Sequence, residues 1–267
     1  LQPKGGNFIK SLHFSHTEIG KLEKEIIAGR KPVLEGLESH LSIDRVYLAR
    51  SVKGDFEKSI RQICRERDIP LKSVPKQFFN KFGRLNHQGI IALKSSTTYY
   101  KLDDLLPILN EREEPPLVLL LEGVTDVRNL GAIARSAEIF SVDILVLPMK
   151  NSAPVNAEAF KTSAGAIRWL NIAREKSIAS AIKRLKQYGF IIYGTELNGD
   201  KAPSDIRGED RIALVMGSEE KGLGSETLKL LDEKIRIPQA GKTDSLNVSV
   251  ASGICLYEIL KKRRFGN

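Results

Sequence analysis

The chain has 267 residues, of which 41% are hydrophobic and 28% charged, enough to build one or two domains with buried cores. Its 42 Lys and Arg residues outnumber 33 Asp and Glu residues, and the pI of about 9.4 favours a polyanionic partner. No apolar run reaches 18 residues and the first residues lack a hydrophobic secretion core, so neither a membrane span nor a secretion signal is expected.

The positive charge is concentrated in the first hundred residues, whose net charge is +8, against −3 for residues 101–115 and +4 for residues 116–267. Residues 1–22 are polar and lack a periodic pattern, so a flexible extension is expected there. We expect a small α/β domain at 23–95, and its charge makes it the better candidate for holding phosphates. The pattern predicts helices at 32–37 and 56–67, and strands at 46–49, 71–74 and 89–93.

Residues 96–115 are predicted to connect this domain to the rest of the chain. The segment is acidic and contains Pro107 and Pro115, with Pro116 directly after it. Because prolines end or bend helices, this composition suits a linker or a connecting helix.

From residue 116 onward, apolar runs typical of buried parallel strands alternate with helical patterns. This alternation predicts an α/β fold with a parallel sheet. The only GxG, at 222–224, follows no suitable first strand, and no GxxxxGK(S/T) loop is present. A nucleotide hydrolase, a dinucleotide-dependent dehydrogenase and a methyltransferase of the standard Rossmann type are therefore disfavoured. Strands are predicted at 117–121, 144–147, 190–193 and 212–216, and helices at 129–140, 178–188 and 248–260.

Cys64 and Cys255 are isolated in the sequence and lie in apolar surroundings, without a CxxC pair or a zinc-ligand spacing. We expect two reduced, buried thiols in a cytoplasmic protein rather than a disulfide. The sequence shows no cluster of metal-ligating residues, and no metal is expected.

Three segments of the larger domain place polar residues at the ends of predicted strands or the starts of predicted helices. The first, NLGAIAR at 129–135, opens a helix in which Asn129 is suited to the N-cap position. Gly131 lets another backbone approach closely, and Arg135, nearly two turns after Asn129, offers a planar set of donors suited to phosphate. Taken alone, this segment could be a capped helix with a surface arginine.

The second segment, VMGSEEKGL at 215–223, leaves a predicted strand at its carboxyl end, where open α/β sheets bind ligands. Gly217 is the first residue after that strand. Glu219 and Glu220 could also be ordinary acidic residues near a helix N-terminus, where the helix dipole favours them.

The third segment, SLNVSVA at 245–251, follows a predicted strand at 236–238 and a polar loop at 241–244. Ser245 is suited to capping the helix that begins here. Asn247 is less ordinary, because an amide in the first turn of a helix that soon becomes apolar needs a hydrogen-bond partner. A ligand or a neighbouring loop would provide it.

In this order within residues 116–267, the three segments resemble the signature motifs of the SpoU, or TrmH-type, branch of the SPOUT methyltransferases. The resemblance implies methyl transfer from S-adenosyl-L-methionine to a ribose 2′-hydroxyl of RNA, and a C-terminal trefoil knot. It also implies a homodimer paired through the knotted region, in which each site takes groups from the partner chain. The positions that match cofactor contacts are Thr195, Glu196, Leu197, Gly217, Ile237 and Leu246. The positions that match catalytic or RNA-binding residues are Asn129, Arg135, Glu219, Ser245 and Asn247.

A ribose 2′-hydroxyl is a weak acid, so it needs positioning, a proton acceptor or stabilisation of its developing negative charge. We expect Arg135 to orient the target phosphate and stabilise the alkoxide, because a guanidinium rarely gives up its proton. Asn129, Glu219, Ser245 and Asn247 would hold the ribose and Arg135 in place. The identity of the general base stays open.

The N-terminal unit has a resemblance of its own. GRKPVLE at 29–35 and NHQGI at 86–90 are similar to the ribosomal-protein-like RNA-binding domain that precedes the catalytic domain in RlmB-type members. His87 alone could be an ordinary loop histidine. The resemblance implies a guanosine of large-subunit (23S-type) ribosomal RNA as substrate. The alternatives are a tRNA ribose methyltransferase and a non-catalytic RNA-binding protein, both on the same scaffold.

Overall fold

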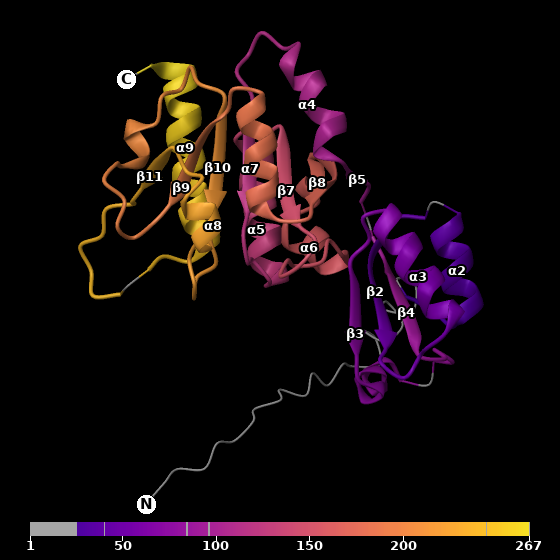
Figure 1. The fold of residues 1–267 in the computed structure, drawn as a ribbon. Helices are drawn as coiled ribbons and strands as arrows, with labels where there is room; N and C mark the ends of the chain where they lie inside the picture. The colour runs from indigo at the N-terminus through magenta and orange to yellow at the C-terminus, as the bar shows by residue number, and fades with distance from the viewer. Residues whose placement is uncertain (1–25, 40, 84, 96, 244, 267) are drawn as a thin grey trace, which may run out of the picture.

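The computed structural model of the chain describes residues 26–39, 41–83, 85–95, 97–243 and 245–266. The described residues form two sheets, each with its own buried core (Figure 1). The flexible extension expected at 1–22 lies outside the described residues.

The first part of the chain folds as a small α/β unit. Its elements are β1 (Ile26–Ala28), α2 (Arg30–Glu38), β2 (Ile43–Ala49), α3 (Asp55–Glu66), β3 (Leu71–Val74), the 3-10 helix η1 (Lys76–Phe82) and β4 (Ile90–Lys94). The strand order is β1-β4-β2-β3, with the last pair parallel and the others antiparallel. Apolar residues at helical spacing, such as Val33 and Leu37 of α2 and Ile60 of α3, form the core with Val46 of β2.

The second part of the chain forms a sheet whose strand pairs are all parallel, in the order β11-β9-β10-β6-β7-β8-β5. The predicted α/β fold with a parallel sheet is confirmed. Its elements are β5 (Tyr99–Tyr100), α4 (Leu102–Asn110), β6 (Leu117–Leu121), α5 (Val127–Ile139), β7 (Ile144–Pro148), α6 (Ala157–Thr162), η2 (Ala166–Trp169), β8 (Asn171–Glu175), α7 (Ile178–Gln187), β9 (Ile191–Thr195), η3 (Pro203–Asp205), β10 (Ile212–Met216), α8 (Ser225–Leu228), β11 (Glu233–Ile235) and α9 (Val248–Phe265).

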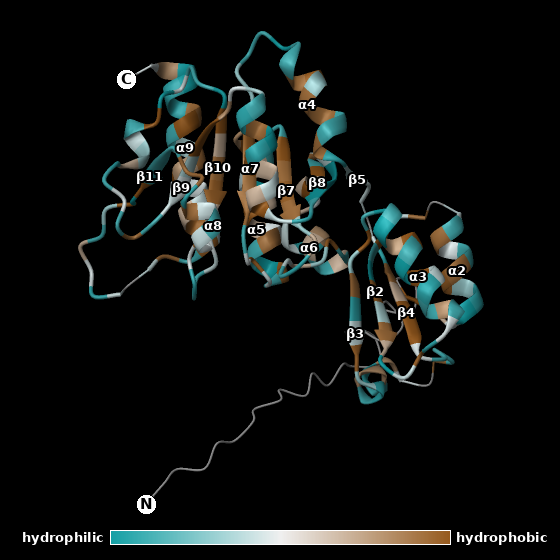
Figure 2. Cartoon of the chain, in the orientation of Figure 1, coloured by the Kyte–Doolittle hydropathy of each residue, from teal (hydrophilic) through white to brown (hydrophobic). Residues whose placement is uncertain are grey.

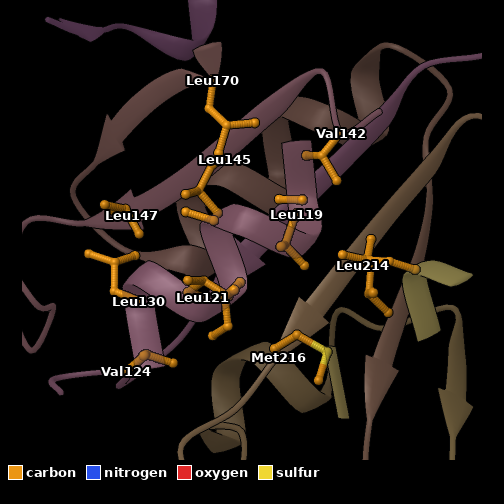
Figure 3. Close-up of a cluster of buried hydrophobic side chains, with 14 of the residues drawn as sticks. Leu119, Leu121, Val124, Leu130, Val142, Leu145, Leu147, Leu170, Leu214 and Met216 are labelled. Atoms are coloured by element: carbon orange, nitrogen blue, oxygen red, sulfur yellow. The ribbon is translucent and has the colours of Figure 1, made fainter. Parts of the chain in front are cut away.

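Helices cover both faces of this sheet because successive strand residues point to opposite sides. Leu119 and Leu121 of β6 share a core with α5, α6 and α9, which contribute residues such as Leu130 (Figure 3). Val118 and Leu120 of the same strand share the opposite core with α4 and α7. Figure 2 shows the apolar character concentrated along the strands and polar residues on the outer sides of the helices.

The segment 96–115 contributes to this second sheet. Tyr99 and Tyr100 form β5, which pairs with β8, and Leu102 and Leu106 of α4 are buried against the sheet. Pro107 lies inside α4, which spans only nine residues. The acidic composition reflects the outer face of α4, whereas its alternate apolar residues fix the segment to the core.

Three of the described strands, β1, β5 and β8, were not predicted from the sequence pattern, and a fourth, β11, was misplaced. β8 and β11 carry charged residues that interrupt the apolar run. The strand expected at 236–238 ends instead at Ile235, and the Arg236 N–H donates to the Lys201 carbonyl across a loop (2.7 Å). Pro238 has no N–H for a ladder, which fits its place outside the strand.

Both cysteines are free and buried, as expected. Burial raises the pKa of the Cys64 thiol and that of the Cys255 thiol to about 12. Among the described helices, none combines the length and the apolar character needed to cross a bilayer.

A buried ion pair joins the two sheets. The Arg174 guanidinium of β8 donates to the Asp44 carboxylate of β2 (2.5 Å) and to its carbonyl oxygen (2.7 Å). The side chains of Asp44 and Arg174 are only 1% and 6% exposed. The Tyr99 hydroxyl donates to the same carboxylate oxygen (2.6 Å), and the guanidinium lies 3.5 Å from the centre of the Tyr99 ring. These contacts, here called the Asp44–Arg174 lock, fix the small domain on the edge of the larger sheet.

Candidate active site

A cavity of about 350 Å³ opens at the carboxyl ends of β9, β10 and β11, where parallel sheets bind ligands. Its walls come from the segments 195–198, 216–222, 235–239 and 245–251. The six positions expected to contact a cofactor all line this cavity, together with Glu219 and Ser245. Those six are Thr195, Glu196, Leu197, Gly217, Ile237 and Leu246.

The loop after β10 is folded tightly enough to require glycine. A Cβ on Gly217 would lie 2.7 Å from the carbonyl oxygen of Gly222 and 2.8 Å from the amide nitrogen of Leu223. Ser218 and Gly222 exchange backbone hydrogen bonds, which closes the loop. Glu122, directly after β6, accepts from the Gly224 N–H (3.0 Å) and so anchors the far end of the loop.

The loop after β9 lies against β11 and the residue that follows it. The Glu196 N–H donates to the Ile235 carbonyl (2.9 Å), and a Cβ on Gly199 would lie 2.7 Å from the Ile235 carbonyl carbon. These contacts bring the β9 and β11 walls of the cavity together. The knotted threading expected of 236–247 passes through residue 244, which lies outside the described residues, and it stays a prediction.

Asn129, Glu219 and Asn247 meet in one hydrogen-bonded cluster. Glu219 Oε1 accepts from Asn129 Nδ2 (3.1 Å), from Asn247 Nδ2 (2.5 Å) and from the Val248 N–H (3.1 Å). Asn247 Nδ2 also donates to Asn129 Oδ1 (3.0 Å). The partner that the Asn247 amide was expected to need is therefore provided by two neighbouring segments, and the three polar residues fix one another.

The caps of the two helices differ from the sequence prediction. Asp126, rather than Asn129, caps α5 by accepting from the Arg128 and Asn129 N–H groups (2.7 and 3.0 Å). Asn247, rather than Ser245, caps α9 by accepting from the Ser249 N–H (2.9 Å). The Asn129 side chain is therefore free to join the Glu219 cluster, whereas Asn247 caps α9 through Oδ1 and joins the cluster through Nδ2.

A second cavity of about 410 Å³ lies beside the first and shares Ser218, Glu219, Glu220, Lys221 and Val248 with it. Its other walls come from the loops after β6 and β7 and include Asn129 and Asn151. Glu219 therefore stands between two adjacent cavities. Within the described ranges, no three His, Cys, Asp or Glu side chains are grouped closely enough to hold a metal ion.

Gly131 permits the close contact expected of it. A Cβ there would lie 3.0 Å from the Ala159 carbonyl oxygen and would also clash with the Thr162 side chain. Only glycine lets α6 pack this tightly against α5.

Two family models match the sequence that builds this site and its neighbouring domain. The model of the SpoU rRNA Methylase family covers residues 116–257, more than half of the chain. The chain belongs to the SpoU rRNA methylase family. A model described as RNA 2′-O ribose methyltransferase substrate binding covers residues 26–100.

Relatives of the chain carry matching names. A protein of Mycobacterium ulcerans named as a tRNA/rRNA methyltransferase is 37% identical over 245 residues, 91% of this chain and 78% of the relative. YacO of Bacillus subtilis, named as a TrmH-family tRNA/rRNA methyltransferase, is 31% identical over 242 residues, which cover 90% of this chain and 97% of YacO. The AdoMet-bound rRNA methyltransferase of Sinorhizobium meliloti matches with a TM-score of 0.58 and 25% identity, over 90% of this chain and 87% of that chain. The expected family is confirmed.

Arg135 is not part of the Glu219 cluster. It is exposed on α5 and lines neither of the two cavities that Glu219 lines. It faces a separate hollow that Ile139 of α5 and Trp169 of η2 also line. A single chain therefore brings Asn129, Glu219 and Asn247 together but leaves Arg135 apart from them.

Three further residues shape the site without having been singled out in the sequence. Glu122 anchors the loop after β10, and Asp126 caps α5. Asn151 lines the second cavity and adopts a left-handed conformation (φ 54°), which asparagine tolerates better than most residues. A signal existed for all three, because each follows the carboxyl end of a predicted strand, where ligand-binding groups gather.

Proposed function

We propose that this SpoU-family methyltransferase uses S-adenosyl-L-methionine to methylate a ribose 2′-hydroxyl of large-subunit ribosomal RNA, at a guanosine. The observation that carries the proposal is the Asn129–Glu219–Asn247 cluster, held rigidly between two adjacent cavities. One cavity would hold the cofactor and the other the nucleotide to be methylated. The substrate-binding match at 26–100 supports a ribose 2′-hydroxyl as the acceptor.

The first cavity fits the cofactor by the chemistry of its walls. Leu197, Ile237 and Leu246 offer apolar surface for an adenine ring, and exposed backbone groups of the loops offer hydrogen bonds. The carboxylates of Glu196 and Glu219 favour a cation, as the sulfonium of S-adenosyl-L-methionine is. When bound, the cofactor supplies an activated methyl group with a good leaving group. The related Sinorhizobium meliloti structure, described as AdoMet-bound, supports this assignment.

The polar cluster can position the acceptor ribose. Glu219 Oε1 is occupied by three N–H donors, and Oε2 has no hydrogen-bond partner among the described residues. Oε2 is thus an acceptor directed by a fixed side chain, suited to a ribose hydroxyl. Because the cluster is already organised before substrate binds, the ribose is oriented without further ordering of protein groups. Ser245, on the rim of the first cavity, would contact the substrate from the other side.

Arg135 would complete the site from a second copy of the chain. The hollow that it lines is flanked by exposed apolar side chains, with Ile139 56% and Trp169 75% exposed, and Tyr257 of α9 is 53% exposed. Exposed apolar groups of this size on neighbouring elements are typical of interfaces. We therefore propose a homodimer in which α5 and α9 pair. Ile254 of α9 is partly buried and available for contact, whereas Ile259 of the same helix belongs to the core.

The methylation proposal predicts one product. With tritiated S-adenosyl-L-methionine, the protein is expected to label large-subunit ribosomal RNA, and nuclease digestion should release 2′-O-methylguanosine. Label in tRNA instead would select the alternative substrate, and a base-methylated nucleoside would contradict the ribose assignment. Titration calorimetry with S-adenosyl-L-methionine separates the remaining rival, because a non-catalytic RNA-binding protein would release no cofactor-dependent heat.

The dimer proposal predicts how the protein sediments. At micromolar concentration the wild type is expected to sediment as a dimer, and Tyr257→Glu should shift it towards a monomer, because a carboxylate buried in an apolar interface is costly. Ile108→Glu is the matched control, since Ile108 is also exposed (62%) but lies on α4, on the opposite face of the sheet. A wild-type monomer that retains full activity would rule out the shared site.

A further inference from the structure

A groove of about 770 Å³ lies between the two domains. One wall is the edge of the small sheet, with Arg45 of β2 and Lys72 of β3. The opposite wall is formed by the segments that follow β7 and β8, with Lys150 and Lys176. These segments leave the carboxyl ends of their strands, on the same edge of the large sheet as the candidate active site (Figure 1).

The charge of the groove is of one sign. Among the residues that the structure describes, four cationic side chains line it and no carboxylate does. Lys72, Lys150 and Lys176 are exposed, and none forms an ion pair or a side-chain hydrogen bond with any residue that the structure describes. Three unpaired lysines that face one groove repel one another unless a negative charge lies between them, so their grouping favours an anionic ligand.

The groove is continuous with the second cavity of the active site. Thr125 and Asn151 line both, and the second cavity in turn shares Glu219 with the first. A chain that places one residue beside Glu219 would therefore pass Asn151 and run between the lysines. This continuity favours a polymeric ligand, because the units next to the reacting one can occupy the groove.

The two walls are held at a fixed separation. The Asp44–Arg174 lock crosses between the domains. Asp44 directly precedes Arg45 on one wall, and Arg174 lies two residues before Lys176 on the other. Arg45 itself donates to the Ser152 carbonyl on the opposite wall (3.0 Å). The cations are thus carried on a rigid frame, which lowers the entropy cost of binding.

We propose that this groove binds the phosphates of a single RNA strand that flanks the target nucleotide, with Lys72, Lys150 and Lys176 as the phosphate contacts. The inference rests on the proposed function, because the continuity of the groove has meaning only if the reacting unit is a ribose. None of the described residues that line the groove is aromatic, so they offer no stacking platform for bases. Contacts to phosphates position an RNA without reading its sequence, and recognition of the target falls to other surfaces.

The test compares two triple variants of the full chain that have the same net charge. In one, Lys72, Lys150 and Lys176 are each replaced by Gln. In the control, Lys58→Gln, Lys183→Gln and Lys229→Gln remove three exposed lysines outside the groove. Fluorescence anisotropy with a labelled oligouridylate of about 12 nucleotides gives the affinity over a range of salt concentrations.

Three lost phosphate contacts on a single strand should make the slope of log affinity against log salt shallower by about 2, with a loss of affinity of about tenfold or more at physiological salt. The control should keep the wild-type slope. An unchanged slope in the groove variant, or an equal change in the control, would overturn the proposal. A labelled oligoadenylate should behave as oligouridylate does, and a strong preference between them would also count against phosphate contacts.

Two measurements separate this inference from the proposed function. The affinity for S-adenosyl-L-methionine should be the same in both triple variants, because the lysines lie outside the cofactor cavity. If wild-type protein methylates RNA while the groove variant keeps the wild-type slope, the groove assignment alone is wrong. If the slope of log affinity against log salt becomes shallower in the groove variant but no ribose methylation is found with any RNA, phosphate binding by the groove stands and the proposed reaction is wrong.

Discussion

Replacing Arg135 by alanine is expected to abolish methyl transfer to RNA while leaving the fold and the cofactor affinity nearly unchanged. The side chain is exposed, lines neither cavity of its own chain, and makes no hydrogen bond or ion pair with any other described residue. Its removal therefore costs no packing. A positive group that stabilises a developing alkoxide contributes on the order of 10²- to 10³-fold to turnover. Single-turnover methylation rates and cofactor calorimetry measure the two effects separately, and turnover above a tenth of wild type would remove Arg135 from the mechanism.

A heterodimer shows whether Arg135 serves the site of its own chain or that of its partner. Arg135→Ala and Glu219→Ala chains with different tags are co-expressed, and the mixed dimer is purified through both tags. If Arg135 acts across the dimer, one of the two sites regains an intact Glu219 and an intact Arg135, and the mixed dimer should show about half the wild-type activity. If Arg135 acts within its own chain, each site carries one defect and the mixed dimer stays inactive. The separation of Arg135 from the Glu219 cluster favours the first result.

The sequence was sufficient for the elements whose apolar residues repeat at a clear period. β6 and β10 are continuous apolar runs and appear where they were predicted, because strands buried on both faces must be apolar throughout. β8 was missed because Arg174 and Glu175 interrupt its pattern. Both are buried and paired, Glu175 with Arg184 of α7 and Arg174 with Asp44 of the small domain, and nothing local in the sequence indicates the second of these partners.

For the candidate site, the residues around the first cavity could be named from the sequence, but the separation of Arg135 from them and the local geometry could not be predicted. The family resemblance named the residues that line the first cavity, and the structure brings them together from four separate segments. The caps of α5 and α9 were misplaced, because Asp126, Ser245 and Asn247 all have side chains suited to an N-cap. The interdomain groove left no local signal, since its four cations come from four distant segments.

We expect the Asp44–Arg174 lock to make a large contribution to the free energy of unfolding. Asp44→Ala would leave the Arg174 guanidinium buried without its carboxylate and the Tyr99 hydroxyl without its acceptor. Breaking a buried ion pair by removing one partner typically costs about 3–5 kcal/mol. For a protein of this size we expect the midpoint of thermal unfolding to fall by about 10 °C. The matched control is Asp55→Ala, because Asp55 pairs with Lys58 on the surface, where both side chains are exposed.

The same variant tests whether the lock holds the domains in register. Asp44 contacts β8 and the segment before α6, since its carboxylate also lies 3.4 Å from the Val155 N–H, so its loss should loosen the small domain without unfolding either core. We expect wild-type protein to resist limited proteolysis and Asp44→Ala to be cleaved between residues 94 and 99, where the chain passes from β4 to β5. RNA affinity should fall with it, because the two walls of the groove then lose their fixed separation. If Asp44→Ala unfolds at the wild-type temperature and resists protease equally, the pair adds nothing that the neighbouring contacts do not already provide.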